Sequence, residues 1–164
     1  MKIIGNFGLV CNAIHFIDLF AWLTDEKLIS VNCDGLDKFW VESKRINFWE
    51  VSGILTAIYS NGSVLTIDSR ITNQSFKFFL YDTSEYVIDE DNGIVYKENE
   101  LLFNETVPLQ SELTPIVVDM IFHKGFCNLP SLKESISLHK PFLESIQIHW
   151  NEFNNLQGDV LKIT

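Results

Sequence analysis

The middle of the chain consists of short apolar segments separated by residues that favour turns, and this pattern restricts the fold more than any other feature. Each segment is rich in aromatic and β-branched side chains, which is the composition of a β-strand. Turn sequences such as Asp34-Gly35 and Asp89–Gly93 lie between the segments. We therefore expect an antiparallel β-meander that includes Leu28–Cys33, Phe39–Val41, Phe76–Tyr81, Tyr86–Ile88, Ile94–Tyr96 and Leu101–Phe103. A further strand is expected at Ile116–Phe122, although Pro115 also suits the first turn of a short helix there.

Residues 46–68 fit two different structures. As a helix, Asn47 would be the N-cap and Glu50 would complete a capping box, which makes residues 47–59 helical. As a hairpin, Asn61-Gly62 would form a two-residue type I′ turn, with Tyr59 opposite Val64, Ile58 opposite Leu65 and Ala57 opposite Thr66. We favour the hairpin for the second half, because its β-branched residues suit a strand. Gly53 would weaken a helix and would mark a bulge or bend in the strand.

The two ends of the chain have helical periodicity. Apolar residues recur at helical spacing from Phe7 to Leu23, and Asn6 is the expected N-cap. A second helix begins after Pro130 and is expected to stop or kink at Pro141, followed by a short helix at Phe142–Trp150.

At the carboxyl terminus, Gly158 and Val160–Ile163 indicate a turn and a terminal strand. The whole pattern predicts a single globular α+β domain over residues 1–164. In this domain an antiparallel β-meander sheet is flanked by an N-terminal helix and C-terminal helices.

The chain is strongly acidic, with 22 acidic and 12 basic residues and a net charge of −10. Nucleic-acid phosphates and anionic membrane surfaces repel such a chain, so we expect neither as a partner. Polar residues interrupt the apolar amino terminus at short intervals, which excludes a signal peptide or a membrane helix there. Cys11, Cys33 and Cys127 are widely spaced and odd in number, which favours reduced, buried thiols in a cytoplasmic protein.

No motif predicts a catalytic residue, a cofactor or a metal site. The opening Gly5-Asn6-Phe7-Gly8 fits a dinucleotide-binding loop only in part, because Phe7 occupies the position of the second glycine and no βαβ pattern follows. His15, His123, His139 and His149 form no cluster in the sequence, which indicates surface or hydrogen-bonded histidines. We therefore expect a protein without enzymatic activity.

The negative charge is concentrated between Asp82 and Glu112, where nine acidic residues and one lysine give a net charge of −8. With a four-residue loop after Asp89, Ile88 would face Val95, Tyr86 would face Lys97, and Glu85 would face Glu98. Like charges in opposite positions destabilise a hairpin, so the acidic residues should have a use. They could form a solvated edge that keeps the hairpin from aggregating, or a docking face for a basic protein partner, which is the use we expect. The predicted contact residues are Asp82, Glu85, Tyr86, Asp89, Glu90, Asp91, Tyr96, Glu98, Glu100 and Phe103.

These features favour a stoichiometric inhibitor, such as an immunity protein that neutralises a basic, nuclease-type toxin domain through its acidic surface. An alternative is a small-ligand-binding β-rich domain, or an enzyme, with a cavity lined by some of its 13 Phe, 4 Trp and 4 Tyr residues. A third is self-association, in which the strand Phe76–Tyr81 pairs with a second copy of itself.

Overall fold

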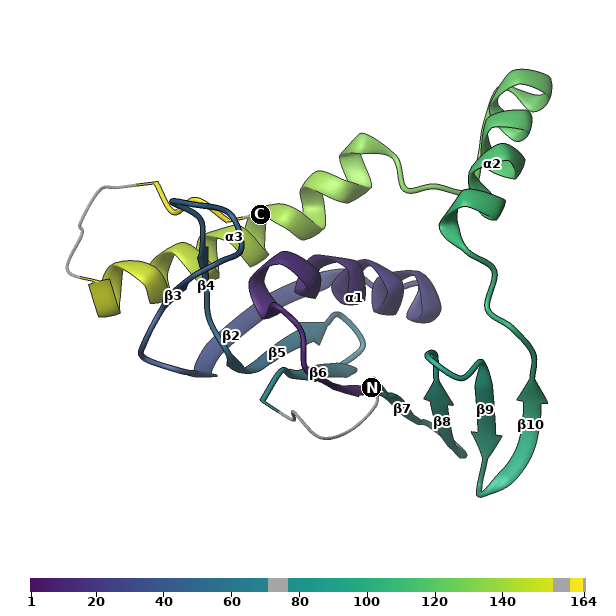
Figure 1. Cartoon of the computed structure of the whole chain (residues 1–164), viewed down its shortest axis with the longest axis horizontal. Coiled ribbons are helices and arrows are strands. Elements are labelled where there is room, and N and C mark those ends of the chain that lie inside the picture. Colours follow the sequence, from purple (N-terminus) through teal and green to yellow (C-terminus); the bar gives the residue numbers. More distant parts are fainter. Residues whose placement is uncertain (71–76, 155–159, 164) are drawn as a thin grey trace.

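The computed structural model describes residues 1–70, 77–154 and 160–163. Over these residues the chain forms one sheet of eight strands, one of two strands, and three helices (Figure 1). The large sheet contains β1 (Lys2–Ile4), β2 (Leu28–Leu36), β5 (Gly53–Tyr59), β6 (Val64–Asp68), β7 (Lys77–Tyr81), β8 (Glu85–Asp89), β9 (Ile94–Lys97) and β10 (Glu100–Asn104). The small sheet pairs β3 (Val41–Glu42) with β4 (Trp49–Glu50), and the helices are α1 (Leu9–Thr24), α2 (Gln110–Lys124) and α3 (Leu132–Asn154).

The strand order of the large sheet is β10-β9-β8-β7-β1-β6-β5-β2. β1 lies in the middle, parallel to β6 and antiparallel to β7. The predicted α+β class is confirmed, but the simple meander is wrong, because β1 joins two antiparallel runs through one parallel pairing. Turn residues predict pairing only between strands that follow one another in the sequence. β1 instead pairs with strands more than sixty residues away.

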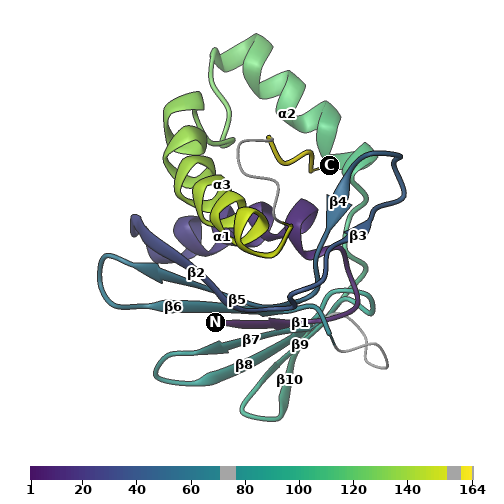
Figure 2. The ribbon, with the colours of Figure 1, turned by 90° about the vertical axis from the view of Figure 1, so that its left-hand side faces the viewer.

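Helices α1 and α3 pack side by side on one face of the sheet and enclose the core (Figure 2). The core contains the buried residues Ile3, Val10, Ile17, Leu55, Leu65, Ile67, Phe142 and Ile146, among others. Tyr59 is also buried there, and its hydroxyl donates a hydrogen bond of 2.8 Å to the backbone oxygen of Ile17. This bond ties β5 to α1 and satisfies a polar group that would otherwise be costly to bury.

The first helix begins two residues later than expected, and its cap is not Asn6. Gly8 is the N-cap residue and has no side chain to cap with. The Glu50 carboxylate from β4 fills this role, with Oε1 2.6 Å from the backbone nitrogen of Val10 and Oε2 3.4 Å from that of Cys11. A tertiary contact thus replaces the local cap.

Two predicted turns differ from the structure. Asp34-Gly35 is not a turn but a bulged part of β2, which continues to Leu36. Of the strand expected at Phe39–Val41, only Val41 is in a strand, which is β3. The hairpin of β5 and β6 is confirmed, and so is a special backbone at Gly53, which has a φ of 136°. Its register is shifted by one residue, since Ile58 pairs with Val64 and Tyr59 bonds to Ser63 around a three-residue loop.

The reason for the shifted register lies in the loop. A type I′ turn needs a positive φ at both central residues, but of Asn61 and Gly62 only Gly62 has one. The Asn61 side chain instead accepts a hydrogen bond from the backbone nitrogen of Ser63. The loop is therefore longer by one residue, and the helical alternative for residues 47–59 is wrong.

The carboxyl-terminal half contains three further corrections. Ile116–Phe122 belongs to α2, so the strand expected there is wrong. Pro141 lies inside α3, which continues to Asn154 instead of stopping. Val160–Ile163 do not form a strand, and Gly158 and Phe76 lie outside the described residues.

The strands β8–β10 extend beyond the part of the sheet that α1 and α3 cover, and α2 stands apart from both helices (Figures 1 and 2). We refer to β8–β10 and α2 together as the arm, residues 85–124. None of the described residues between Phe78 and Leu138 belongs to the buried core. Among the described helices, none is long and apolar enough to cross a membrane.

Candidate functional site

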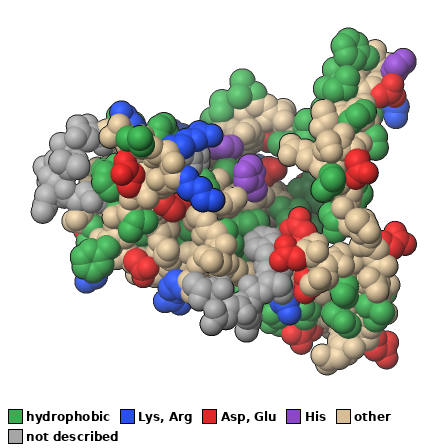
Figure 3. Space-filling model, in the orientation of Figure 1, with side chains coloured by type: hydrophobic (Ala, Val, Ile, Leu, Met, Phe, Trp, Pro, Cys, Tyr) green, Lys and Arg blue, Asp and Glu red, His purple; other side chains and the backbone are tan. Residues whose placement is uncertain are grey.

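A pocket of about 200 Å³ lies between α1 and the first turns of α3. Four polar side chains and three apolar residues line it, namely His15, Asp18, Ser135 and His139 with Ile14, Pro130 and Leu138. Figure 3 shows histidine side chains in the middle of this face, where the two helices lie side by side. The pocket thus combines groups that exchange protons with an apolar floor, a combination typical of ligand sites.

Helical spacing explains how each helix contributes to the pocket. His15 and Asp18 are three residues apart on α1, and Ser135 and His139 are four apart on α3, so each pair shares one face of its helix. Leu138 is buried beneath them and fixes the rotation of α3 against the core. The two histidines are far apart in sequence, and only the packing of α3 against α1 brings them to one pocket.

His139 is held in a defined orientation by its own helix. Its Nδ1 lies 2.9 Å from the backbone oxygen of Ser135 and 3.2 Å from the Ser135 hydroxyl oxygen. A carbonyl oxygen only accepts, so the neutral ring carries its proton on Nδ1 and leaves Nε2 as an acceptor. The side chain of His139 can therefore accept a hydrogen bond from a ligand hydroxyl.

Of the residues that line the pocket, Asp18 is half-buried and His15 is exposed. Burial raises the pKa of Tyr59, and the negative charge of Asp18 raises it further. Asp18 therefore brings a carboxylate both to the pocket and to the neighbourhood of the Tyr59 hydroxyl. The described residues contain no group of three or more His, Cys, Asp or Glu side chains suited to hold a metal ion.

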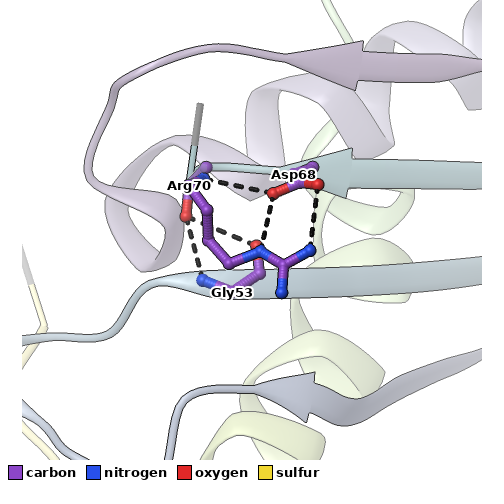
Figure 4. A network of polar contacts seen from close by, with 4 residues as sticks. Gly53, Asp68 and Arg70 are labelled. Atoms are coloured by element: carbon purple, nitrogen blue, oxygen red, sulfur yellow. Dashed lines mark hydrogen bonds and ion pairs between the residues drawn. The ribbon is translucent and has the colours of Figure 1, made fainter. Parts of the chain in front are cut away.

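A second polar network lies where β6 ends (Figure 4). Asp68 is buried, and it accepts hydrogen bonds from the Arg70 backbone nitrogen at 3.1 Å, from Nε at 3.1 Å and from Nη2 at 3.2 Å. These contacts hold the pKa of Asp68 below its usual range. Ser69 donates its backbone N–H to the oxygen of Gly53 and accepts from the Gly53 nitrogen, which fixes β6 to the start of β5. These polar groups form hydrogen bonds with one another, so we assign the network a role in stabilising the fold.

The aromatic side chains pack against one another in the core. Phe16 contacts Phe7 and Phe78 edge to face, with ring centroids 5.3 and 6.0 Å apart. Trp150 contacts Trp40 at 5.1 Å and Trp49 at 5.3 Å. Such rings stabilise the junction of sheet and helices. None of these six rings lines the pocket between α1 and α3.

The predicted contact residues for a basic partner all lie on the arm or at the turn before it, but the structure does not gather them on one face. Asp82, Glu85, Glu98 and Glu100 lie at one end of the strands, and Asp89, Glu90 and Asp91 lie at the other end. Glu85 is on the sheet face opposite to Tyr86, and Tyr96 is opposite to Phe103. The separation follows from the alternation of side chains along a strand. No described contact tests this docking, which stays a prediction.

The predicted register of the β8–β9 hairpin is confirmed. Tyr86 pairs with Lys97 and Ile88 with Val95, and the Lys97 Nζ lies 5.5 Å from the centre of the Tyr86 ring. Glu98 adopts a φ of 48° in the next turn, and its backbone nitrogen donates to the Glu85 oxygen at 2.9 Å. The two glutamates therefore lie opposite each other at the end of the hairpin, where a backbone hydrogen bond joins them and Glu98 is already in the turn after β9.

Sequence reasoning missed the pocket, because His15 and His139 carry no shared motif. The spacing of His15 to Asp18 and of Ser135 to His139 is the available signal, and it becomes specific only once the helices are known to touch. His123 lies in the last turn of α2 and Cys127 follows the helix. Gly125 between them has the positive φ of a helix end, as expected from the turn sequence.

The fold has counterparts among solved structures, whereas no protein-family model and no curated protein matches the chain. UDP-N-acetylglucosamine 3-dehydrogenase GnnA from Acidithiobacillus ferrooxidans superposes with a TM-score of 0.58 at 12% identity, over 90% of this chain and 50% of that one. A Thermotoga maritima protein described as an oxidoreductase gives a TM-score of 0.53 at 15% identity, over 89% and 50%. The chain thus spans about half the length of these proteins.

These likenesses correct the functional hypothesis. The solved structures compared here that share the fold are dehydrogenases or proteins described as oxidoreductases. The chain shares its fold with enzymes, and this finding contradicts the predictions of a non-enzymatic protein and of an immunity protein. The prediction relied on the net charge, which is a property of the composition. In the structure the acidic residues of the arm are divided between the two ends of its strands (Figure 3).

Proposed function

We propose that the chain is the substrate-binding part of an oxidoreductase, and that the pocket between α1 and α3 receives a hydroxyl group of a sugar-like substrate. The observation that carries the proposal is the meeting of His15 and His139 at one pocket. The likeness of the fold to UDP-N-acetylglucosamine 3-dehydrogenase supports the substrate class.

Acid–base chemistry at a hydroxyl suits the groups in the pocket. Oxidation of an alcohol carbon transfers a hydride to an acceptor, which would be bound outside the described residues, and it releases the hydroxyl proton. A neutral imidazole can accept that proton. His15 is the acid–base residue in this proposal. His139, held through Nδ1 by Ser135, orients the substrate hydroxyl with Nε2.

The described residues do not fit a dinucleotide. In dinucleotide-binding folds the pyrophosphate sits at the amino end of the first helix. Here the Glu50 carboxylate occupies that end, and a Cβ atom on Gly8 would lie only 2.6 Å from its Oε2. An anion in this place would be repelled. We therefore derive only substrate binding and proton transfer for these residues.

The pocket is small for a complete sugar nucleotide. Pockets that enclose drug-sized ligands are roughly 300–1,000 Å³ in volume, whereas this one is about 200 Å³. We expect it to hold one sugar ring or part of one, with the remainder of the ligand outside.

NMR spectroscopy of the histidine rings tests the proposal. UDP-N-acetylglucosamine should shift the ring signals of His15 and His139 and leave those of His123, which is exposed on α2, unchanged. His15→Asn should weaken binding at least about tenfold, which equals about 1.4 kcal/mol. His123→Asn is the matched control and should bind as the wild type does. Equal shifts at all three histidines, or none with UDP-N-acetylglucosamine or free N-acetylglucosamine, would overturn the proposal.

A further inference from the structure

The large sheet ends at β10, whose outer edge, away from β9, pairs with no strand among the described residues (Figure 1). All five residues of β10 are exposed, and the exposed fractions of Leu101 and Leu102 are 58% and 61%. β2, at the other end of the sheet, instead packs against α3. β7, for which we expected pairing with a second copy, is hydrogen-bonded to β1 and to β8 and has no free edge.

The backbone of Asn104 points its polar groups away from β9. The Glu105 N–H donates to the Gly93 oxygen at 3.1 Å, on the side where β9 lies. In a trans peptide unit the N–H and the preceding C=O point in opposite directions, so the Asn104 carbonyl points outward. The N–H of Asn104 points to the same side, because both groups of one residue face the same neighbouring strand. An extended segment of another protein can bond to both groups.

A pocket of about 500 Å³ adjoins this end of β10. It is lined by Glu90 and Asp91 of the β8–β9 turn, and by residues 106–110, which follow directly after Glu105. Among the described residues, no hydrogen bond or ion pair engages the carboxylates of Glu90 and Glu105. The open edge thus leads into a negatively charged pocket, which a Lys or Arg side chain complements.

The middle of β10 differs from an edge that is only solvated. Edge strands that avoid pairing carry charged side chains or proline, whereas β10 exposes Leu101, Leu102 and Phe103 in a row. A bulge between Leu101 and Phe103 interrupts the strand. Regular pairing is therefore restricted to a short stretch around Asn104, which suits a short segment.

A second copy of β10 suits this edge less well than a basic partner does. Antiparallel pairing of two β10 strands about their middle would place the two bulges against each other. It would also bring together two arms, each of which contains nine acidic residues and two lysines. Like charges at such an interface oppose association.

We propose that the outer edge of β10 at Asn104 and the adjoining pocket bind an extended, basic segment of a partner protein, which adds a short strand to the sheet. Asn104 holds the backbone of the segment, Phe103 contacts an apolar side chain, and Glu105 and Glu90 pair with Lys or Arg side chains. The docking predicted for the whole arm is thereby narrowed to one edge. The inference is independent of the proposed function, because none of these residues lines the pocket between α1 and α3.

An NMR titration with the blocked hexapeptide acetyl-Lys-Thr-Leu-Thr-Lys-Thr-amide tests the proposal. Both lysines and the leucine lie on one face of this peptide when it is extended, as Phe103 and Glu105 do on β10. The peptide should bind saturably and shift the amide signals of Phe103, Asn104 and Glu105, but not those of His15 and His139. The same peptide with glutamate in place of lysine should bind at least about tenfold more weakly.

Substitution of Asn104 separates backbone pairing from charge attraction. Asn104→Pro removes the outward N–H and leaves the side that faces β9 unchanged, and proline is tolerated on an edge strand at such a position. This variant should bind the lysine peptide at least about tenfold more weakly than the wild type. Asn104→Ala keeps the N–H and is the matched control, which should bind as the wild type does.

Removal of charge gives a second, independent check. Glu90→Gln combined with Glu105→Gln should raise the dissociation constant at least about threefold at low salt. Glu144→Gln combined with Glu152→Gln removes the same charge from exposed positions on α3 and should have no effect. Circular dichroism checks that each variant is folded.

Three outcomes would overturn the proposal. The first is equal binding of the lysine and glutamate peptides, and the second is equal binding by Asn104→Pro and Asn104→Ala. The third is a mass that rises with protein concentration in the wild type and not in Asn104→Pro, which would assign the edge to a second copy of this chain.

Discussion

His149 shows how burial determines the chemistry of a single residue in this protein. Its ring is buried on α3, with centroids 5.8 Å from Trp40 and 4.7 Å from Phe153, and Nδ1 has no hydrogen-bond partner among the described residues. Burial lowers the pKa of His149, against the opposing charges of Glu152 and Asp34. The folded state therefore holds the neutral ring.

This lowered pKa predicts a dependence of stability on pH. Below about pH 6.5 the unfolded chain binds a proton at His149 that the folded chain takes up less readily, so the free energy of unfolding should fall as the pH falls. His149→Phe keeps an aromatic ring but cannot be protonated. Its urea unfolding midpoint should change less between pH 7.5 and pH 5 than that of the wild type, whereas His123→Asn should retain the full change. An identical pH profile for His149→Phe and the wild type would contradict the prediction.

Glu50 illustrates a contact that local sequence rules cannot assign. The spacing of Asn47 to Glu50 matches a capping box, and that pattern predicts a helix at residues 47–59. In the structure Glu50 does cap a helix, but the helix is α1, whose first turn lies forty residues earlier. The sequence therefore identified Glu50 as a capping residue, but it did not identify the helix that Glu50 caps.

Among the elements, the β5–β6 hairpin depends on two glycines with different surroundings. Gly53 has a φ of 136°, and a Cβ there would lie 2.5 Å from the Cα of Leu36 and 2.7 Å from the oxygen of Gly35. Gly62 has a φ of 85°, but no atom lies within 4 Å of a Cβ at that place. The first glycine is required by both backbone conformation and space, and the second by conformation alone.

These surroundings predict unequal effects of the same substitution. Gly53→Ala should lower the free energy of unfolding by about 3 kcal/mol, because strain and a backbone clash act together. Gly62→Ala should lower it by about 1 kcal/mol through strain alone. Urea denaturation of both variants checks the difference, and equal losses would show that the close approach of β2 to Gly53 is not maintained in solution.

Local sequence patterns predicted most of the helices and strands. The errors lie where tertiary packing determines the secondary structure. The β8–β9 register was predictable because the four-residue loop and the alternation of side chains are both local. Pro141 was expected to stop or kink a helix, yet α3 continues through it because Leu138, Phe142 and Ile146 on both sides are buried in the core. Burial of these side chains offsets the lost backbone hydrogen bond.

At the scale of the whole molecule, the buried core and the arm differ in what holds them in place. The core lies between α1, α3 and the strands β1, β2, β5, β6 and β7, and it contains all the fully buried large side chains among the described residues. The arm is connected to it through β7 and buries little. Regions with few buried apolar contacts open at lower free energy than the core.

Hydrogen exchange should therefore separate the two regions. At low protein concentration the amides of α2 should exchange much faster than those of β5, β6 and the middle of α1. Protection of α2 equal to that of β5 in the dilute protein would contradict this picture.

The sequence by itself determined the strands in the middle of the chain and the helices at its two ends, because side-chain periodicity and turn residues act within a few positions. Only the tertiary structure decided the place of β1 between β6 and β7, the cap that Glu50 provides for α1, and the pocket shared by His15 and His139. Each of these joins residues that are 40 to 124 positions apart. Such contacts follow from how elements pack around a common core, and no local pattern records that packing.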